Sequence, residues 1–400
     1  MSDAVWVLGA SMTKIARYDD KDVVDLAAQA SFDALDDAGI SIFDVNVLAA
    51  GSLFSQGGIG QQISKQIGQT GIPIYNVTNA CATGATAVRT AYMSIKAGES
   101  EIGLAIGCEQ MGKMGLLGGA GQAKGARKVF EPAGRFGGVM PVEGVLGSGT
   151  MPAVFGQAGM EYAYQHDGVG FEQSAKVAEK NHAHSTLNPL AQYQKAFSLE
   201  EIMNARVISY PNTLPMCCPT GDGAAAIVLV SEAKLRTLSL EQQKRAVKIG
   251  ASVLTSDPWV EGGESQPDVN TLTRNAANQA YEIAGVGPED LDLVELHDCF
   301  ATAELLHYDN LGLCEPGGAG EFIDSRAPWR DGRIPVNASG GLLSKGHPIG
   351  MTGAAGVFEI TTQLRGEAGD RQIEGAKVGM AHVIGLGSSC GIHILEKAAL

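Results

Sequence analysis

The sequence lacks the features that mark membrane, secreted or nucleic-acid-binding proteins. Its 400 residues include no apolar run near the ~18 residues that span a bilayer, and no charged leader with an apolar core begins the chain. Basic residues are scarce: 29 Lys and Arg face 44 Asp and Glu, and the formal net charge of −15 disfavours nucleic acid and anionic membrane surfaces. The seven cysteines, an odd number, follow no disulfide-framework spacing, so we expect reduced thiols in a cytoplasmic protein.

What the chain has in excess is glycine and internal similarity. The 53 glycines, about twice the usual ~7% share, are scattered and so mark tight turns and close backbone approaches. Residues 25–48 predict a helix, a glycine stop, a short acidic link and a strand, and residues 271–294 repeat this order at a fixed offset. Because one core rarely supports a chain of this length, we expect two duplicated α/β halves.

Later elements of the two halves also correspond. A turn at Cys81 and the helix after it match a turn at His347 and a helix over residues 351–364. Each helix is followed by a buried-looking strand, at residues 102–107 and 378–383. This alternation of strands and helices predicts a layered α/β fold with mostly parallel sheets.

The halves differ by one insertion in the first. We expect an N-terminal half of residues 1–111 and 216–244, an inserted loop domain of residues 112–215, and a C-terminal half of residues 245–400. The insertion is rich in glycine and methionine, with a polar helical run at residues 171–184. Loops on a rigid scaffold commonly carry specificity, and methionine adapts to varied apolar ligands, so this segment is expected to cover a site where the halves meet.

The chemistry is concentrated around Cys81. Residues 79–84 read Asn-Ala-Cys-Ala-Thr-Gly, after a strand-like run at 74–77 and before a helical stretch at 85–96. A thiol at a helix N-terminus lies near unpaired amides, which favour the thiolate. Two histidine segments lie far downstream: residues 297–300 read His-Asp-Cys-Phe, and residues 346–350 read Gly-His-Pro-Ile-Gly. Two cysteines and two histidines at element ends suit acyl transfer through a thioester.

These motifs resemble those of thiolases, and the likeness runs essentially end to end. The nucleophile turn of that family resembles residues 79–84, and its base motif resembles residues 336–341 followed by 346–353. Residues 219–225 resemble the segment that returns from the family's loop domain. The resemblance implies the thiolase fold: two duplicated halves in αβαβα layers, with a loop domain inserted in the first.

Two departures indicate a subfamily. Where this chain has His-Asp-Cys-Phe at residues 297–300, better-known thiolases carry Asn-Glu-Ala-Phe. Where it has Val-Ile-Gly at residues 383–385, they have a Cys-x-Gly motif. Both changes resemble the thiolases related to sterol carrier protein 2, whose second catalytic cysteine lies in the His-Asp-Cys-Phe segment. Since the chain ends soon after the last expected strand, no appended sterol-carrier domain is expected.

The resemblance assigns roles to four side chains and two amides. Cys81 is expected to take the acyl group, and His347 to accept its proton and help polarise the substrate carbonyl. Cys299 is expected to act as the second acid/base, since a reference thiol pKa of ~8.5 needs only modest tuning. His297 is expected to join His347 around the thioester oxygen, and the backbone amides of Cys81 and Gly385 to form a second oxyanion hole.

Other candidates are weaker. A zinc site at His297 and Cys299 needs further ligands at suitable spacing, and no such set is visible, so neither a metal nor a bound cofactor is expected. His382 could line the cleft. We interpret the remaining cysteines as structural: Cys108, Cys217, Cys218, Cys314 and Cys390. Candidate contacts for coenzyme A, the expected co-substrate, are Lys113, Lys124, Arg127, Lys128, Arg135 and Ser339, although a solvated or subunit-contact loop explains the basic residues equally well.

We therefore expect an acyl-CoA C-acyltransferase that acts on 3-ketoacyl-CoA in either direction, as a homodimer or homotetramer that could have an accessory protein. A decarboxylating condensing enzyme shares the duplicated fold but does not need Cys299. Two alternatives stay open: a steroid side-chain retro-aldolase of the same subfamily, and a non-catalytic protein that binds lipid or acyl-CoA.

Overall fold

The computed structural model describes residues 4–55, 57–112, 151–258, 269–386 and 389–398. Nine strands form one sheet in the order β3-β2-β4-β7-β1-β8-β11-β10-β9, in which β1 to β8 is the junction between the two halves of the chain. The first half supplies β1 (Val5–Met12), β2 (Val47–Gly51), β3 (Ile74–Val77), β4 (Ile102–Gln110) and β7 (Asp222–Ser231). The second supplies β8 (Val247–Thr255), β9 (Leu293–Glu295), β10 (Val378–Gly385) and β11 (Ser389–Lys397).

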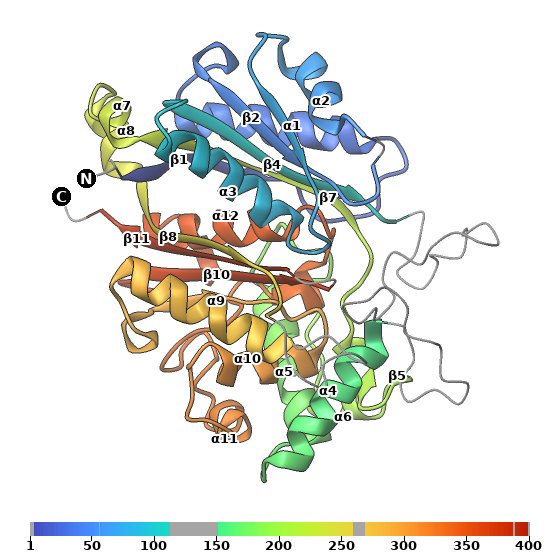
Figure 1. Ribbon diagram of the computed structural model, residues 1–400. Helices are drawn as coiled ribbons and strands as arrows, with labels where there is room; N and C mark the ends of the chain where they lie inside the picture. Colours follow the sequence, from blue (N-terminus) through green and yellow to red (C-terminus); the bar gives the residue numbers. More distant parts are fainter. Residues whose placement is uncertain (1–3, 56, 113–150, 259–268, 387–388, 399–400) are drawn as a thin grey trace.

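Helices lie outside and between the two halves of the sheet (Figure 1). The first half carries α1 (Val23–Ala38), α2 (Ile59–Ile67), α3 (Thr83–Lys96), α7 (Glu232–Leu235) and α8 (Leu240–Arg245). The second carries α9 (Val269–Ala284), α10 (Ala301–Asn310), α11 (Ala319–Asp324) and α12 (Thr352–Arg365). In the described ranges, no helix is both long enough and apolar enough to cross a membrane.

The duplication is visible in matching local geometry. Helix α1 ends at Gly39 with φ 65°, and α9 ends at Gly285 with φ 71°, a left-handed conformation that glycine adopts without strain. Each glycine is followed by a short 3₁₀ turn and then by β2 or β9. The repeat predicted over residues 25–48 and 271–294 is therefore present.

The expectation of mostly parallel sheets is wrong. Only β2–β3, β2–β4 and β9–β10 are parallel, whereas β1–β7, β1–β8, β4–β7, β8–β11 and β10–β11 are antiparallel. Strand β10 ends at Gly385 and β11 begins at Ser389, and so short a connection can join only antiparallel strands. In the first half, β7 corresponds to β11. It also runs antiparallel to the strand before it, β4, because the chain leaves the sheet after β4 for the insertion and then returns to pair with β4.

Helices α3 and α12 lie between the two halves of the sheet and meet at their N-termini (Figure 1). A Cβ added at Gly84 would lie 2.8 Å from the Ala354 nitrogen, and one at Gly353 would lie 2.3 Å from the Ala85 nitrogen. Only glycine permits this approach at either position. As a result, the turn that ends in Cys81 lies beside the turn that contains His347.

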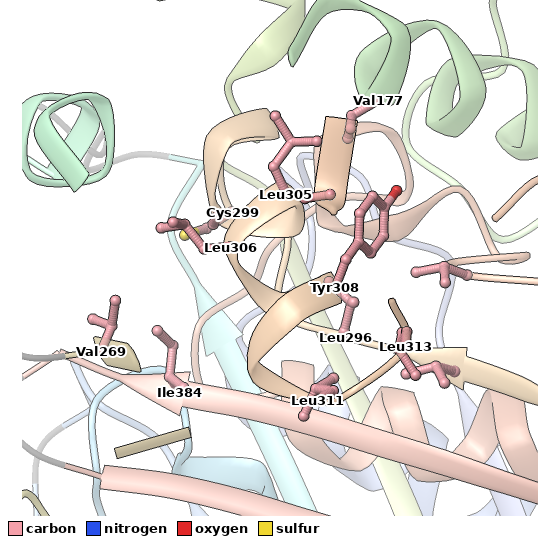
Figure 2. Packing of buried hydrophobic residues seen from close by; sticks show 14 of the residues in the cluster. Val177, Val269, Leu296, Cys299, Leu305, Leu306, Tyr308, Leu311, Leu313 and Ile384 are labelled. Atoms are coloured by element: carbon pink, nitrogen blue, oxygen red, sulfur yellow. The ribbon is translucent and has the colours of Figure 1, made fainter. Parts of the chain in front are cut away.

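The insertion shares a core with the second half. It contains α4 (Met151–Gln165), α5 (Phe171–Ser185), α6 (Leu199–Met203), β5 (Val207–Ser209) and β6 (Asn212–Thr213). The Phe155 ring of α4 lies 5.5 Å from the Phe300 ring, and the Tyr162 hydroxyl donates to Asp309 at 2.9 Å. Figure 2 shows Val177 of α5 beside Leu305 and Tyr308 of α10, in the same cluster as Cys299. The segment that contains Cys299 packs within this shared core.

Candidate active site

Cys81 lies in a tight turn between β3 and α3. Ala80 has φ 48°, a left-handed conformation that is strained for a residue with a side chain. The Thr83 hydroxyl donates to the Ala80 carbonyl at 2.6 Å and accepts from the Asn79 amide at 2.8 Å. The Asn79 side chain in turn donates to Thr86 at 2.9 Å. These bonds explain the asparagine and threonine of the motif, because they hold the turn that presents the thiol.

The resting Cys81 thiol is neutral. Burial raises the pKa of Cys81 to about 12; its own amide opposes this shift and the Glu109 carboxylate adds to it. The helix N-terminus does favour the thiolate, as expected, because the Cys81 amide lowers the pKa, but burial has the larger and opposite effect. A neutral thiol that acts as a nucleophile needs a base at the moment of attack.

His347 is the predicted base. Its Nδ1 lies 2.7 Å from the Thr352 hydroxyl, and that hydroxyl donates its single hydrogen to the Pro348 carbonyl at 3.0 Å. Nδ1 must therefore carry the hydrogen that it shares with Thr352, which leaves Nε2 as a free acceptor. Burial, and secondarily the Lys345 ammonium, lowers the pKa of His347 to about 3, so the ring is neutral.

His297 follows β9 and faces His347. The two rings lie 5.3 Å apart between centroids at an interplanar angle of 78°. One ligand-type atom each of Cys81, His297 and His347 lies within 4.8 Å of the others. Burial, and then His347, holds the pKa of His297 well below its usual value. The fold thus brings the predicted nucleophile and both predicted histidines to one place.

Cys299 is buried two residues beyond His297. Burial, followed by the neighbouring Cys218 and Cys81 thiols, raises its pKa well above the ordinary value. Only modest tuning was expected, and the difference arises because Cys299 has almost no contact with solvent. Cys218, interpreted from the sequence as structural, donates its amide to the Cys299 carbonyl at 3.0 Å.

Gly385 ends β10 directly against the Cys81 turn. A Cβ there would lie 2.3 Å from the Asn79 carbonyl oxygen and 3.2 Å from the Ala82 nitrogen. The backbone of Gly385 therefore lies against the Cys81 turn, and the oxyanion hole formed by the two amides stays a prediction. By contrast, Cys390 is fully buried and pairs with Thr255 and Ile384 across the sheet, which agrees with a packing role.

Two further histidines back His297. The His297 amide donates to His382 Nδ1 at 3.4 Å, and the His382 and His307 rings lie 4.6 Å apart. Within the described part of the chain, His382 Nε2 and both ring nitrogens of His307 are buried without a hydrogen-bond partner. His382 thus contacts the His297 backbone and is not part of the cluster of ligand atoms around Cys81.

Asp298 links three segments that surround the predicted catalytic residues. It accepts from the Leu342 amide at 2.7 Å, the Leu343 amide at 3.3 Å and the Asn181 side chain at 2.7 Å. Leu342 and Leu343 belong to the short π-helix Gly341–Lys345, which opens the His347 loop, residues 341–350. One carboxylate therefore joins the His297–Cys299 segment, the His347 loop and helix α5.

A buried ion pair extends this anchor. Lys180 lies 2.9 Å from Glu304 and also donates to the Val336 carbonyl at 2.7 Å. Glu304 further accepts from Asn181 at 2.7 Å and Asn337 at 2.8 Å. The sequence analysis missed Lys180, Asn181 and Glu304, because a polar helix such as residues 171–184 is usually solvated and nothing in its spacing showed that this face turns inward.

Glu109, which the sequence analysis also missed, joins two segments on the other side of the site. At the end of β4 it accepts from the Leu53 and Phe54 amides at 2.8 and 3.1 Å, the Ser52 hydroxyl at 2.8 Å and the Gly350 amide at 3.2 Å. Burial raises the pKa of Glu109, against these bonds. Its contacts hold the Gly350 turn, which follows His347.

The candidate coenzyme A contacts are only partly visible. The basic set lies outside the described residues: Lys113, Lys124, Arg127, Lys128 and Arg135. Ser339 is fully buried, and it donates twice to the Glu295 carboxylate, through its hydroxyl at 2.5 Å and through its amide at 3.0 Å. Glu295 is in turn paired with Lys345 at 3.1 Å. This placement argues against a coenzyme A contact through the Ser339 side chain.

Family models identify the class. The thiolase N-terminal domain matches residues 5–209, and the thiolase C-terminal domain-like model matches residues 264–397. The chain therefore belongs to the thiolase family, has the thiolase fold and is an acyltransferase enzyme.

Known proteins place it more closely. The chain is 39% identical over 392 residues to sterol carrier protein 2 of Homo sapiens, covering 96% of this chain and 70% of that protein. It is 34% identical over 405 residues to the acetyl-CoA acetyltransferase of Methanothermobacter thermautotrophicus, covering 98% and 99%. The solved Ltp2-ChsH2(DUF35) aldolase matches with a TM-score of 0.82 at 22% identity, covering 100% and 99% of the two chains, and shares the fold. The predicted relation to sterol carrier protein 2 is confirmed.

Proposed function

We propose that the protein is a 3-ketoacyl-CoA thiolase or acetyl-CoA acetyltransferase that works through an acyl group on Cys81. The observation that carries this proposal is the cluster of Cys81, His297 and His347 atoms within 4.8 Å of one another, with Cys299 beside it. The acetyl-CoA acetyltransferase relative supports coenzyme A as co-substrate. Such an activity belongs to lipid metabolism, as in β-oxidation.

In thiolysis, the Cys81 sulfur attacks the 3-keto carbon while His347 Nε2 accepts the thiol proton. The amides of Cys81 and Gly385 hold the resulting alkoxide. When the carbon–carbon bond breaks, its electron pair passes to the CoA-bound fragment, whose thioester oxygen is held by His297 and protonated His347. The Cys299 thiol then protonates that carbanion, and acetyl-CoA or propionyl-CoA leaves.

The second half-reaction restores every group. Cys299, now a thiolate, takes the thiol proton of a second coenzyme A, whose sulfur attacks the Cys81 thioester. Cys81 leaves as a thiolate and regains its proton from His347. The raised pKa of Cys299 supports this order, because burial keeps Cys299 protonated and ready to act first as an acid. The reverse sequence is a condensation.

Mass spectrometry after mixing with a simple acyl-CoA tests the proposal. Wild-type protein should gain one acyl group on the Cys81 peptide, and Cys81→Ala should lose both the adduct and turnover. Persistent thiolysis in that variant above the uncatalysed rate contradicts the assignment. A retro-aldolase, the activity of the structural neighbour, would cleave its substrate without acylating Cys81, and a non-catalytic binder would do neither.

Association with a second copy is part of the proposal. Strand β3 forms one edge of the sheet, and its Tyr75 side chain is 49% exposed. Open edges readily pair with another chain, so a homodimer or homotetramer is expected, to be measured by light scattering. All seven cysteines are free, which supports a reducing compartment such as the cytoplasm.

A further inference from the structure

The catalytic cluster has the composition of a metal site. Cys81 supplies a sulfur, and His297 and His347 each supply a ring nitrogen, all within 4.8 Å of one another. Across residues 4–112 and 151–398, apart from the short undescribed gaps, no other three His, Cys, Asp or Glu ligands lie this close together. One thiolate and two imidazoles form a donor set that favours Zn²⁺, which commonly takes three protein ligands and a water.

The atoms of the cluster are also available and oriented. His347 has its Nδ1 tied to Thr352 at 2.7 Å, so Nε2 keeps a free lone pair. Metal-binding histidines are usually held through their second nitrogen in this way. His297 Nδ1 is buried without a partner among the described residues. The three ligand atoms therefore start near one another, and a small side-chain movement would bring them to the ~2.0–2.3 Å bond lengths of Zn²⁺.

We infer that the enzyme without substrate binds one Zn²⁺ ion at Cys81, His297 and His347, and that the bound ion blocks acylation. On binding, Zn²⁺ replaces the hydrogen of the Cys81 thiol, which leaves to solvent as a proton, and a water fills the fourth position. A chelator reverses the step and the thiol regains a proton. An acyl group on Cys81 excludes the ion because the thioester sulfur is a poor ligand. Cys299, weighed from the sequence as a zinc ligand, is not part of the set.

Binding can be measured without any substrate. Metal-free protein should take up one equivalent of Zn²⁺ in competition with a chromophoric chelator. With Co²⁺ as a probe, it should show thiolate-to-metal charge transfer and the intense visible bands of a four-coordinate site. The charge transfer should vanish in Cys81→Ser and persist in Cys299→Ser and Cys390→Ser. If it vanishes in Cys299→Ser but persists in Cys81→Ser, the site is misassigned.

A conservative variant tests the supporting contact. Thr352→Val keeps the side-chain volume but removes the partner of His347 Nδ1, and the loss of such a contact typically lowers metal affinity ~10–100-fold. His297→Ala and His347→Ala should lower it further. Unchanged affinity in all three variants overturns the proposal.

Wild-type protein provides a measurement that does not depend on variants that fold. Zn²⁺ should slow alkylation of Cys81 by iodoacetamide, read from its peptide mass, while the partly exposed Cys314 should react as before. Equal alkylation of Cys81 with and without saturating Zn²⁺ overturns the inference. The loss of activity rests on the proposed function, but the binding does not. A protein that binds the ion without being acylated therefore contradicts only the thiolase assignment, and one that is acylated but binds no ion contradicts only the metal site.

Discussion

The His347 ring stands edge-on to the His297 ring, at a centroid distance of 5.3 Å and an angle of 78°. The two rings come from different segments of the second half and converge on Cys81 of the first. Both are neutral because burial lowers the pKa of each. If Cys81 is the nucleophile, as we propose, a neutral His347 can take up its proton and then donate that proton in a hydrogen bond toward the substrate.

His297→Ala should lower turnover by roughly 10²–10³-fold, the usual effect of losing one oxyanion donor. Acyl-CoA affinity and fold should change little, because the lost hydrogen bond forms with the substrate. Steady-state kinetics measures the effect, with His166→Ala at the end of α4 as the control for removing a histidine. Near-normal turnover in His297→Ala would show that this ring does not hold the thioester oxygen.

Cys299→Ala should separate the two half-reactions. A simple acyl-CoA should still acylate Cys81, whereas carbon–carbon bond making and breaking should fall ~10²–10⁴-fold, the scale of a general acid/base group. Adduct mass and thiolysis rate are measured together, with Cys390→Ala as the matched buried thiol. If Cys390→Ala gives this phenotype and Cys299→Ala does not, the wrong cysteine has been assigned.

Asp298→Asn should lower turnover by displacing the His347 loop. The new amide would direct hydrogens toward donors, so the bonds from Leu342, Leu343 and Asn181 cannot all persist. A buried donor left without an acceptor costs about 1–3 kcal/mol, so the free energy of unfolding should also fall.

The matched control is Asp292→Asn, since Asp292 also accepts two backbone amides, from Lys377 and Val378, but at the far end of β10. Both variants should lose stability in urea unfolding, and only Asp298→Asn should lower kcat and shift the pH profile of turnover. If the two variants lower kcat equally, Asp298 has only a structural role.

Stability should fall steeply below about pH 6.5. Burial lowers the pKa of His184, His307 and His347 to about 3 and that of His393 to about 4, against ~6.5 in an unfolded chain. Between these values the unfolded state binds more protons, so stability is complete above pH ~6.5 and is lost as pH falls. In that window, each of these histidines lowers the free energy of unfolding by about 1.4 kcal/mol for each pH unit of acidification.

Urea unfolding at a series of pH values measures this slope. His307→Leu should reduce the slope of stability against pH by the contribution of one histidine. It should not lower stability at pH 7, because both ring nitrogens of His307 are buried without a partner among the described residues. Stability that does not change between pH 7 and pH 5 would contradict the buried neutral histidines.

Local patterns in the sequence determined the elements and the repeat. The strand expected at residues 74–77 is β3, and the helix expected at 171–184 is α5 (Phe171–Ser185). The equivalence of residues 25–48 and 271–294 reappears as two helices that end at left-handed glycines. These features depend on neighbours along the chain, since periodicity and turn chemistry are local. The motifs around Cys81, His297 and His347 were also sufficient to predict the family.

Only the tertiary structure decided the pairing of strands and the electrostatics of the site. The antiparallel placement of β7 depends on where the chain returns from its insertion, which no local pattern encodes. The neutral Cys81 thiol results from desolvation by groups far apart in sequence, which outweighs the local preference of a helix N-terminus. Lys180, Asn181 and Glu109 joined the site for the same reason: a polar side chain becomes an anchor only when folding removes its water and supplies a partner.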